Sequence, residues 1–253
     1  MVKYNKRTVI ITGGTKGIGA AISRRYYEDG SYVVIGARDD NGIAKELGER
    51  AKFFKIDVRS KVDHVNLMRR ALNWTGRIDV YINCAGFSEW KPVEKVDENF
   101  LNKMIDTNLK GTFFGCQAAA SGMKKEGCII NISSLAGKRG SANNSVYCAT
   151  KFAVNGITQA LAKELGSRGI RVNAVCPVYV ETDGVLKALN DKDSPAKGKD
   201  VLKYLKKFVL ESSALDHLPD AEDVAELCVF LSSPKAKSIT GQCINVDCGV
   251  LPQ

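Results

Sequence analysis

Seven short runs of apolar, mostly β-branched residues recur along the chain, and longer amphipathic stretches separate them. Several runs are apolar at successive positions rather than alternate ones, which is typical of strands buried on both faces. Strands that alternate with helices predict parallel strands joined by right-handed crossovers. We therefore predict an α/β fold with a doubly wound parallel sheet of about seven strands and helices on both faces. The predicted strands are 8–12, 32–37, 53–57, 79–83, 128–133, 171–176 and 243–247.

The chain is expected to form a single domain over residues 1–253. Its 253 residues, of which 44% are hydrophobic, suffice for one substantial core, and no repeat or low-complexity linker divides them. The segment 184–213 interrupts the alternation, because it has no strand signal and contains "SPAKGK" before an amphipathic helix resumes. A long excursion of this kind is usually functional or mobile. We interpret it as a substrate lid, and a disordered surface loop is the alternative.

The charge pattern argues against nucleic-acid binding. The formal net charge is +9, and the densest basic part, Lys187 to Lys207, holds seven lysines and three aspartates. No aromatic series is interleaved there to stack bases, so a solvated basic surface is the simpler reading. The two histidines, His64 and His217, are far apart and lack a ligand pattern, so no metal site is predicted.

The N-terminal stretch and the cysteines together predict a cytoplasmic protein. The first apolar run has four residues, far below the ~20 that span a bilayer, so neither a signal peptide nor a membrane helix is expected. The eight cysteines stand singly without a CxxC pair. Such scattered cysteines are typical of reduced core residues rather than of a disulfide framework.

A glycine-rich turn, "TGGTKGIGAAI", follows the first predicted strand and opens a helix. Gly13, Gly17 and Gly19 permit a tight turn from strand to helix. They also let a pyrophosphate approach the backbone amides at the positive end of that helix. A glycine trio alone is weak evidence, but its position after the first strand predicts a dinucleotide site.

Tyr147 and Lys151 stand one helical turn apart in "SVYCATKFAV". Free tyrosine has a pKa of about 10, so its use as a base near neutrality needs a stabilised phenolate. A lysine at i+4 lies on the same helix face and favours the charged form of its neighbour, and an oxidised nicotinamide would add a second positive charge. The pair therefore predicts a general acid/base. The alternative is that Tyr147 packs and Lys151 reaches solvent.

These motifs, with four others in a fixed order, resemble the short-chain dehydrogenase/reductase family. The six are "TGGTKGIG" at 12–19, "DV" at 57–58, "NCAG" at 83–86, Asn108 in "DTNLKG", Ser134 in "NISSLAG", and Tyr147 with Lys151. The resemblance spans roughly residues 7–249. It implies a Rossmann-type fold and an enzyme that transfers a hydride between a nicotinamide cofactor and a CH–OH group.

The end of the second predicted strand indicates which cofactor is used. An acidic residue there would accept hydrogen bonds from the adenosine ribose and repel a 2′-phosphate. This chain instead has Ala37 followed by Arg38, and Lys16 of the glycine turn can come alongside. Two cations at this place predict NADP(H). The alternative is that Arg38 is a surface cation paired with Asp39 or Asp40.

The resemblance implies a catalytic set of Asn108, Ser134, Tyr147 and Lys151. Tyr147 would exchange the proton, Ser134 would hold the substrate oxygen, and Lys151 would hold the nicotinamide ribose. Asn108 would hold a water that connects Lys151 to solvent, although an exposed helical position is its alternative. The adjacent Ser133 is the alternative to Ser134 in this role, and either hydroxyl could instead only form a hydrogen bond with the backbone. The implied cofactor-binding residues are Gly13, Thr15, Lys16, Gly17, Ile18, Gly19, Arg38, Asp57, Val58, Asn83, Ala85, Gly86, Tyr147, Lys151, Pro177, Val180 and Thr182.

The sequence departs from the family pattern at three positions. Val178 stands where glycine is usual after Pro177, so a backbone with positive φ would be strained and the loop is expected to differ. Cys84 replaces an asparagine and Cys248 replaces a glycine. The candidate pocket residues, chosen because they flank the motifs, are Trp90, Arg139, Asn144 and Tyr179.

The predicted function is an NADP(H)-dependent oxidoreductase that interconverts a secondary alcohol and a ketone, with Tyr147 as the general acid/base. One alternative is a 3-oxoacyl-[acyl-carrier-protein] reductase, for which Lys125 and Arg168 stand where basic residues face the carrier. The other is a non-catalytic NADP-sensing protein of the same fold. The family implies a homotetramer or dimer. A small carbonyl or alcohol substrate is the expected partner, with neither nucleic acid nor a membrane.

Overall fold

A seven-stranded sheet, parallel throughout, forms the centre of the computed structural model, which describes residues 7–252. The strand order is β3-β2-β1-β4-β5-β6-β7, so the winding reverses between β1 and β4. This is the predicted doubly wound, Rossmann-type sheet. Its strands are β1 Thr8–Thr12, β2 Tyr32–Ala37, β3 Ala51–Lys55, β4 Val80–Asn83, β5 Cys128–Ile132, β6 Arg171–Pro177 and β7 Cys243–Val246.

Five strands differ from the predicted ranges, and in β5, β6 and β7 the difference is one residue at the carboxyl end. Strand β3 begins and ends two residues before the predicted range 53–57, because Ala51 pairs with Val33 in β2. Strand β4 begins after Asp79, whose carboxylate accepts the amide of Thr8 at 2.8 Å. At that end of the sheet the Thr8 amide bonds to a side chain instead of to the backbone of β4. A pattern of apolar residues does not indicate such a bond.

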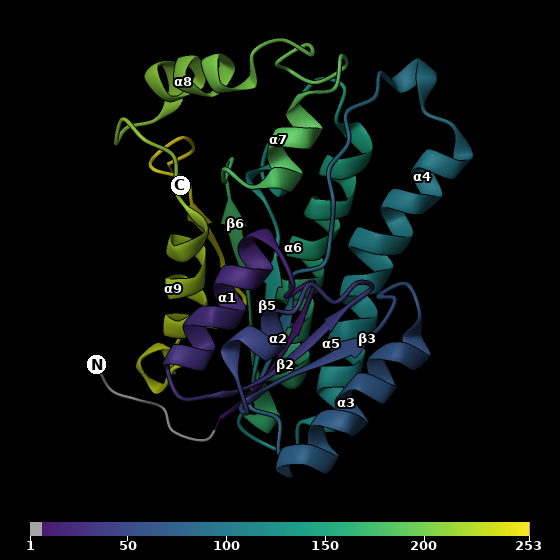
Figure 1. The fold of residues 1–253 in the computed structure, drawn as a ribbon, viewed down its shortest axis with the longest axis vertical. Helices are drawn as coiled ribbons and strands as arrows, with labels where there is room; N and C mark the ends of the chain where they lie inside the picture. Colours follow the sequence, from purple (N-terminus) through teal and green to yellow (C-terminus); the bar gives the residue numbers. More distant parts are fainter. Residues whose placement is uncertain (1–6, 253) are drawn as a thin grey trace.

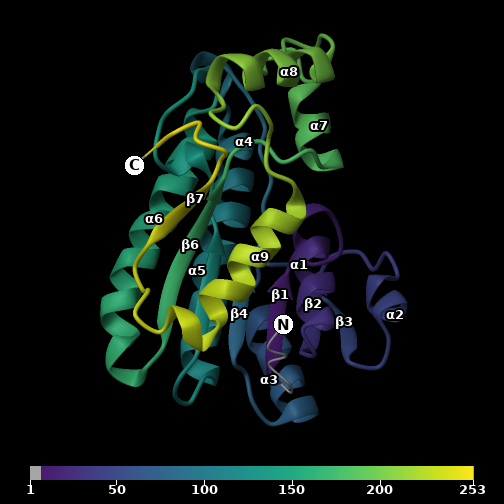
Figure 2. The ribbon, with the colours of Figure 1, turned by 90° about the vertical axis from the view of Figure 1, so that its left-hand side faces the viewer.

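Helices cover both faces of the sheet (Figures 1 and 2). Helices α1 and α9 pack on one face, and α3, α5 and α6 pack on the other. The helices are α1 Gly17–Glu28, α2 Ile43–Leu47, α3 Lys61–Thr75, α4 Glu98–Met104, α5 Gly111–Gly122, α6 Ser145–Leu165, α7 Asp183–Leu189, α8 Val201–Ser212 and α9 Ala221–Ser232. No helix within residues 7–252 is long and apolar enough to cross a membrane.

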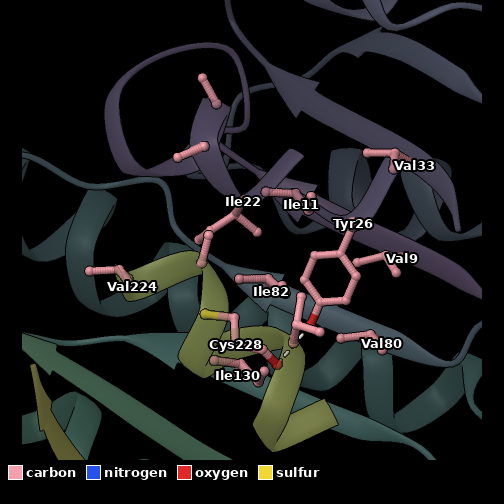
Figure 3. Close-up of a cluster of buried hydrophobic side chains, with 14 of the residues drawn as sticks. Val9, Ile11, Ile22, Tyr26, Val33, Val80, Ile82, Ile130, Val224 and Cys228 are labelled. Carbon is pink, nitrogen blue, oxygen red and sulfur yellow. Dashed lines mark hydrogen bonds between the residues drawn. The ribbon is translucent and has the colours of Figure 1, made fainter. Parts of the chain in front are cut away.

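The core on the α1 and α9 side is closed by a buried tyrosine (Figure 3). Tyr26 of α1 reaches across to α9, where its hydroxyl donates to the backbone oxygen of Cys228 at 2.8 Å. Ile22 and Val224 belong to the same cluster. All eight cysteines are free thiols, and five of them are buried, as the sequence predicted.

The segment 184–213 is folded and packed rather than a disordered loop. Helices α7 and α8 lie together at one end of the molecule (Figures 1 and 2). Leu189 of α7 and Leu205 of α8 are buried against Trp90, which comes from the loop after β4. The apolar face of α8 is therefore accounted for, and the predicted amphipathic helix forms over 201–212.

His64 is fully buried at the start of α3 and joins three parts of the fold. Its Nε2 lies 2.9 Å from the backbone oxygen of Val58, and its Nδ1 lies 2.8 Å from the hydroxyl of Tyr81 in β4. Because a carbonyl only accepts, Nε2 carries the proton and Nδ1 accepts from Tyr81. Burial lowers the pKa of His64. The hydrogen bond to Val58 and the charges of Asp63 and Asp57 raise it by smaller amounts.

This geometry predicts that the protein loses stability in weak acid. A lowered pKa in the folded state means that only the unfolded chain binds this proton as pH falls below about 6.5. The free energy of unfolding is then constant above that pH and decreases below it, by at most about 1.4 kcal/mol per pH unit for this group. His64→Gln should remove this part of the decrease, measured by chemical denaturation from neutral pH down to about pH 5.

The matched control is His217→Gln, because His217 is the second histidine of the chain and is exposed. It should follow the wild-type curve. An unchanged pH dependence in His64→Gln would show that another group carries the effect.

Candidate active site

Three loops that follow β1, β4 and β6 meet at the carboxyl ends of the strands. A Cβ atom on Gly13, which has φ +71°, would lie 2.8 Å from Cα of Ala85. A Cβ on Gly19 would lie 2.2 Å from the backbone oxygen of Gly13, so glycine is required at both positions. On the other side, Thr182 approaches Gly17, at 3.3 Å from such a Cβ. The structure thus gathers the glycine turn, "NCAG" and Thr182 around one place.

The start of α1 suits a bound phosphate. Lys16 is the N-cap residue of this helix, yet no side chain caps it and no acidic residue lies in its first turn. The leading amides of a helix otherwise need a partner, and an anion can serve as one. The backbone oxygen of Thr15 accepts from the Asn41 side chain, which fixes the turn from outside. The residues present therefore fit a pyrophosphate here.

Two cations stand beside the glycine turn without an ion pair. Lys16 and Arg38 are both exposed, and among residues 7–252 no carboxylate pairs with either. The alternative that Asp40 neutralises Arg38 is not observed, because its carboxylate accepts the amide of Gly42 at 2.8 Å. Asp57 binds Arg59 through both carboxylate oxygens, which lowers its pKa, with Arg38 adding a small effect.

Asn108 is fully buried, so the alternative of an exposed helical position is wrong. The predicted long helix is interrupted there by a π-helical turn, Ile105–Lys110, between α4 and α5. The Asn108 amide accepts from the nitrogen of Phe87 at 3.0 Å and donates to its oxygen at 2.9 Å. A Cβ on the preceding Gly86 would lie 3.1 Å from Oδ1 of Asn108 and 3.8 Å from Nζ of Lys151. Asn108 therefore fixes the "NCAG" loop beside Lys151.

The two adjacent serines after β5 have different surroundings. Ser133 is buried and its hydroxyl donates to the backbone oxygen of Lys151 at 3.3 Å. Ser134 is half-buried, its oxygen accepts the amide of Ala136 at 3.1 Å, and it lies close enough to Tyr147 to act against the rise in the pKa of that phenol. Ser134 therefore stays the predicted donor to a substrate oxygen, while Ser133 bonds to the backbone of α6.

Tyr147 and Lys151 lie on one face of α6, with Nζ of Lys151 5.6 Å from the centre of the Tyr147 ring. Burial raises the pKa of Tyr147 to about 12, although the bond from Ser134 acts in the opposite direction. Burial lowers the pKa of Lys151 to about 8, and its Nζ donates to the backbone oxygen of Ile132 at 2.8 Å. In this structure the effect of burial on the Tyr147 pKa therefore outweighs the expected effect of the lysine.

The loop after β6 has a different form from the family pattern, as expected. Val178 is not among the residues with positive φ, and its amide donates to the oxygen of Val246 at 3.2 Å. Cys248 has φ +52° instead, at the second position where glycine is usual. Val180 is buried in the cluster against which Ile18 packs, so this loop reaches the glycine turn.

The candidate pocket residues come from three segments: the loop after β4, the residues before α6 and the loop after β6. Trp90 is buried against α7 and α8, and Tyr179 packs against Phe208 of α8 with ring centres 5.0 Å apart. Asn144 is buried as the N-cap residue of α6, whereas Arg139 is exposed. Ser88 was not predicted from the sequence, and its hydroxyl is buried without a hydrogen-bond partner among residues 7–252. Its position two residues after "NCAG" was the available signal.

Other predicted residues serve the fold rather than an open surface. The Asn83 side chain donates to Asn131 at 2.9 Å and so joins β4 to β5. Arg168 donates to the oxygens of Ala120 and Met123 at the end of α5, so it is not a free cation. Arg168 and the exposed Lys125 precede β6 and β5, at the opposite end of the sheet from Ser134. Thr15, Val58 and Pro177 are buried at the carboxyl ends of β1, β3 and β6.

Comparison with known proteins places this site in one family. Residues 13–251 match the family model described as Enoyl-(Acyl carrier protein) reductase. The 3-oxoacyl-[acyl-carrier-protein] reductase of Chlamydia muridarum is 34% identical over 96% of this chain and 97% of its own length. The diacetyl reductase [(S)-acetoin forming] of Staphylococcus epidermidis is 36% identical over 97% of this chain and 98% of its own.

A solved structure agrees with these relatives. A variant of the actinorhodin polyketide ketoreductase, solved with NADPH, superposes with a TM-score of 0.89 at 29% identity, covering 97% of each chain. Its architecture, the family match over almost the whole chain, and the ordered motifs lead to one conclusion. The chain belongs to the short-chain dehydrogenase/reductase family of oxidoreductases.

Proposed function

We propose that this protein is an NADP(H)-dependent oxidoreductase that interconverts a secondary alcohol and a ketone. The observation that carries the proposal is the position of Tyr147, with Nζ of the buried Lys151 5.6 Å from the centre of its ring and Ser134 close enough to affect its pKa. Two hydroxyls that converge on one point can hold a substrate oxygen, and a buried cation next to them favours negative charge there.

The structure suggests how each side chain acts on the substrate. The hydride comes from the nicotinamide of the bound cofactor. Ser134 donates a hydrogen bond to the carbonyl oxygen, and Tyr147, protonated at neutral pH because burial raises its pKa to about 12, gives that oxygen a proton. Lys151, whose pKa burial lowers to about 8, can exchange protons near neutrality. Asn108 holds Gly86 and Phe87 in place beside it.

The preference for NADP(H) rests on Arg38 and Lys16. Both cations are exposed beside the uncapped start of α1, with no carboxylate partner among residues 7–252. A charge-assisted hydrogen bond to a phosphate contributes about 1.5–3 kcal/mol, which is about tenfold or more in binding. The NADPH named with the polyketide ketoreductase structure is in line with this choice.

The reductase of carrier-bound 3-oxoacyl chains is the less favoured candidate. The relative in Chlamydia muridarum has that name. The cations expected to face the carrier lie at the far end of the sheet, and Arg168 is bound to backbone oxygens. The lid also packs against Trp90 and Tyr179, which follow β4 and β6. We therefore favour a small ketone or alcohol, in line with the diacetyl reductase relative.

Self-association through α5 and α6 is part of the proposal. Phe113 of α5 and Phe152 of α6 are exposed to 45% and 48%, a large fraction for aromatic side chains. An apolar surface of this kind on two neighbouring helices is typical of a contact between subunits.

Tyr147→Phe tests the proton transfer. The variant should lower kcat by about 10²–10⁴, the usual contribution of a general acid. NADPH affinity should stay within about twofold, because the variant keeps the ring and loses one hydroxyl. Turnover is followed by NADPH absorbance and binding by fluorescence titration. Unchanged turnover would contradict the mechanism, and absence of turnover in the wild type with every ketone tried would favour the sensor alternative.

The neighbouring serines provide a matched pair. Ser134→Ala should lower kcat by about 10²–10³, as expected when one donor to a developing oxyanion is lost. Ser133→Ala should leave kcat within a few-fold and lower the free energy of unfolding by about 1 kcal/mol, because it loses a bond to backbone. Steady-state kinetics and denaturation on both proteins measure this. The reverse ranking of the two kcat values would assign the substrate oxygen to Ser133.

Arg38→Ala tests the cofactor choice. It should raise KM for NADPH by about 10- to 100-fold and leave KM for NADH within about twofold, since only NADPH carries the 2′-phosphate. Arg69→Ala, the same change at an exposed position on α3, is the control and should alter neither. An equal loss for both cofactors would refute the assignment of Arg38.

A further inference from the structure

Two buried side-chain oxygens, one in the loop after β4 and one at the start of α6, have no hydrogen-bond partner within residues 7–252. They are Oγ of Ser88 and Oδ1 of Asn144. Buried polar atoms in folded proteins are nearly always paired, so an unpaired one needs an explanation. Both come from segments that flank Tyr147, which makes a missing substrate group the natural explanation.

Asn144 is the N-cap residue of α6, but it does not cap the helix. An asparagine at this position usually turns its Oδ1 back to the amides of the first turn. Here no side-chain cap bond forms, and the amide nitrogen is directed to Oγ of Ser141 at 3.4 Å. Oδ1 is thus left as a buried acceptor three residues before Tyr147. At that spacing two helical side chains have Cβ atoms about 5–6 Å apart.

Ser88 comes from the facing segment. The loop that carries it is fixed at Phe87 by Asn108, and three residues later the amide of Lys91 donates to the oxygen of Asn143 at 2.6 Å. This bond draws the segment 88–91 against residues 143–144, the start of α6. Ser88 and Asn144 therefore approach the catalytic site from two chain segments that lie side by side.

The surroundings of these two atoms are otherwise apolar and aromatic. Trp90 is buried in the lid cluster, and Tyr179 packs on Phe208. Burial and the Tyr204 hydroxyl raise the pKa of Tyr179, with smaller effects from Arg139 and Tyr147, so Tyr179 lies near the reacting hydroxyl. Asn143 donates to the oxygen of Asp193 at 3.0 Å, which joins the lid to the start of α6. The lid cluster that these residues join is mainly apolar and aromatic.

The chemistry of the two atoms selects a hydroxyl group. Oδ1 of Asn144 only accepts, so its partner must carry a proton, and the Ser88 hydroxyl can donate to the same partner. A hydroxyl can donate to one and accept from the other at once. An ammonium would be a second buried cation beside Lys151, which burial disfavours.

We propose that Ser88 and Asn144 bind a second oxygen of the substrate, the hydroxyl on the carbon next to the reacting one. The substrate class is then an α-hydroxy ketone and its vicinal diol, with an otherwise apolar body. This inference rests on the proposed function, because it places the reacting carbonyl at Ser134 and Tyr147.

Matched ketone pairs that differ only by this hydroxyl test the proposal. The pairs are acetoin and butanone, 2-hydroxycyclohexanone and cyclohexanone, and 2-hydroxyacetophenone and acetophenone. In the pairs that the wild type reduces with NADPH, kcat/KM should favour the hydroxy ketone by about tenfold or more, because a site built for a hydroxyl rejects the analogue that lacks it. Asn144→Leu should reduce this ratio to about threefold or less, because it lowers kcat/KM for the hydroxy ketone more than for the plain ketone.

Two further variants keep the test independent of folding. Ser88→Ala is a smaller change and should lower the same ratio by about fivefold or more. Asn102→Leu, the same substitution on the exposed face of α4, should change neither the ratio nor kcat. The thermal midpoint of cofactor-free Asn144→Leu should equal or exceed that of the wild type, because the change removes an unpaired buried atom. A structural role for Asn144 would instead lower it.

The outcomes separate this inference from the proposed function. If the wild type reduces both members of every pair equally well, or if Asn144→Leu lowers both members equally, the hydroxyl subsite is wrong and the oxidoreductase stands. If no ketone in the panel is reduced with NADPH or NADH, the proposed function fails and the subsite with it. A hydroxy-ketone preference that Asn144→Leu and Ser88→Ala both abolish supports the proposal.

Discussion

The buried ammonium of Lys151 is the interaction on which the rest of the site depends. Among residues 7–252 no carboxylate pairs with it, and its Nζ donates to the backbone oxygen of Ile132 at 2.8 Å. Burying a cation without an anion costs free energy, and the lowered pKa of this lysine expresses that cost. The gain is a cation already in position to stabilise negative charge that forms only during a reaction.

The fold holds this lysine through neighbours that touch no substrate. Asn108 interrupts the helix with a π-helical turn, a feature frequent at functional sites, and both atoms of its amide bind the backbone of Phe87. Gly86 can then lie against Asn108 and Lys151 because it has no side chain. Asparagine has a poor helix propensity, but at this position its hydrogen bonds to the loop at Phe87 compensate for it.

The sequence predicted those features that depend on local chemistry, and missed those set by long-range contacts. The sheet, the glycine turn and the Tyr147–Lys151 pair follow from spacing and residue type, whereas Ser134 was predicted only through the family resemblance. The start of β4 does not, because the carboxylate of Asp79 takes the place of a ladder bond there. Ser88 was not predicted for a similar reason. Its location near the start of α6 depends on the backbone hydrogen bond from Lys91 to Asn143, which the sequence does not indicate.

The departures from the family pattern are connected in space, which explains why the motifs alone do not specify the substrate. Val178 avoids a positive φ, and its amide joins the end of β7 through Val246. The left-handed residue is instead Cys248, at a cost of about 1–2 kcal/mol for a residue with a Cβ. The backbone oxygen of Cys248 accepts both the amide of Ala214 and the hydroxyl of Ser213, at the exit of the lid. The turn at Cys248 is thus hydrogen-bonded to the residues that directly follow α8, whose Leu205 packs against Trp90.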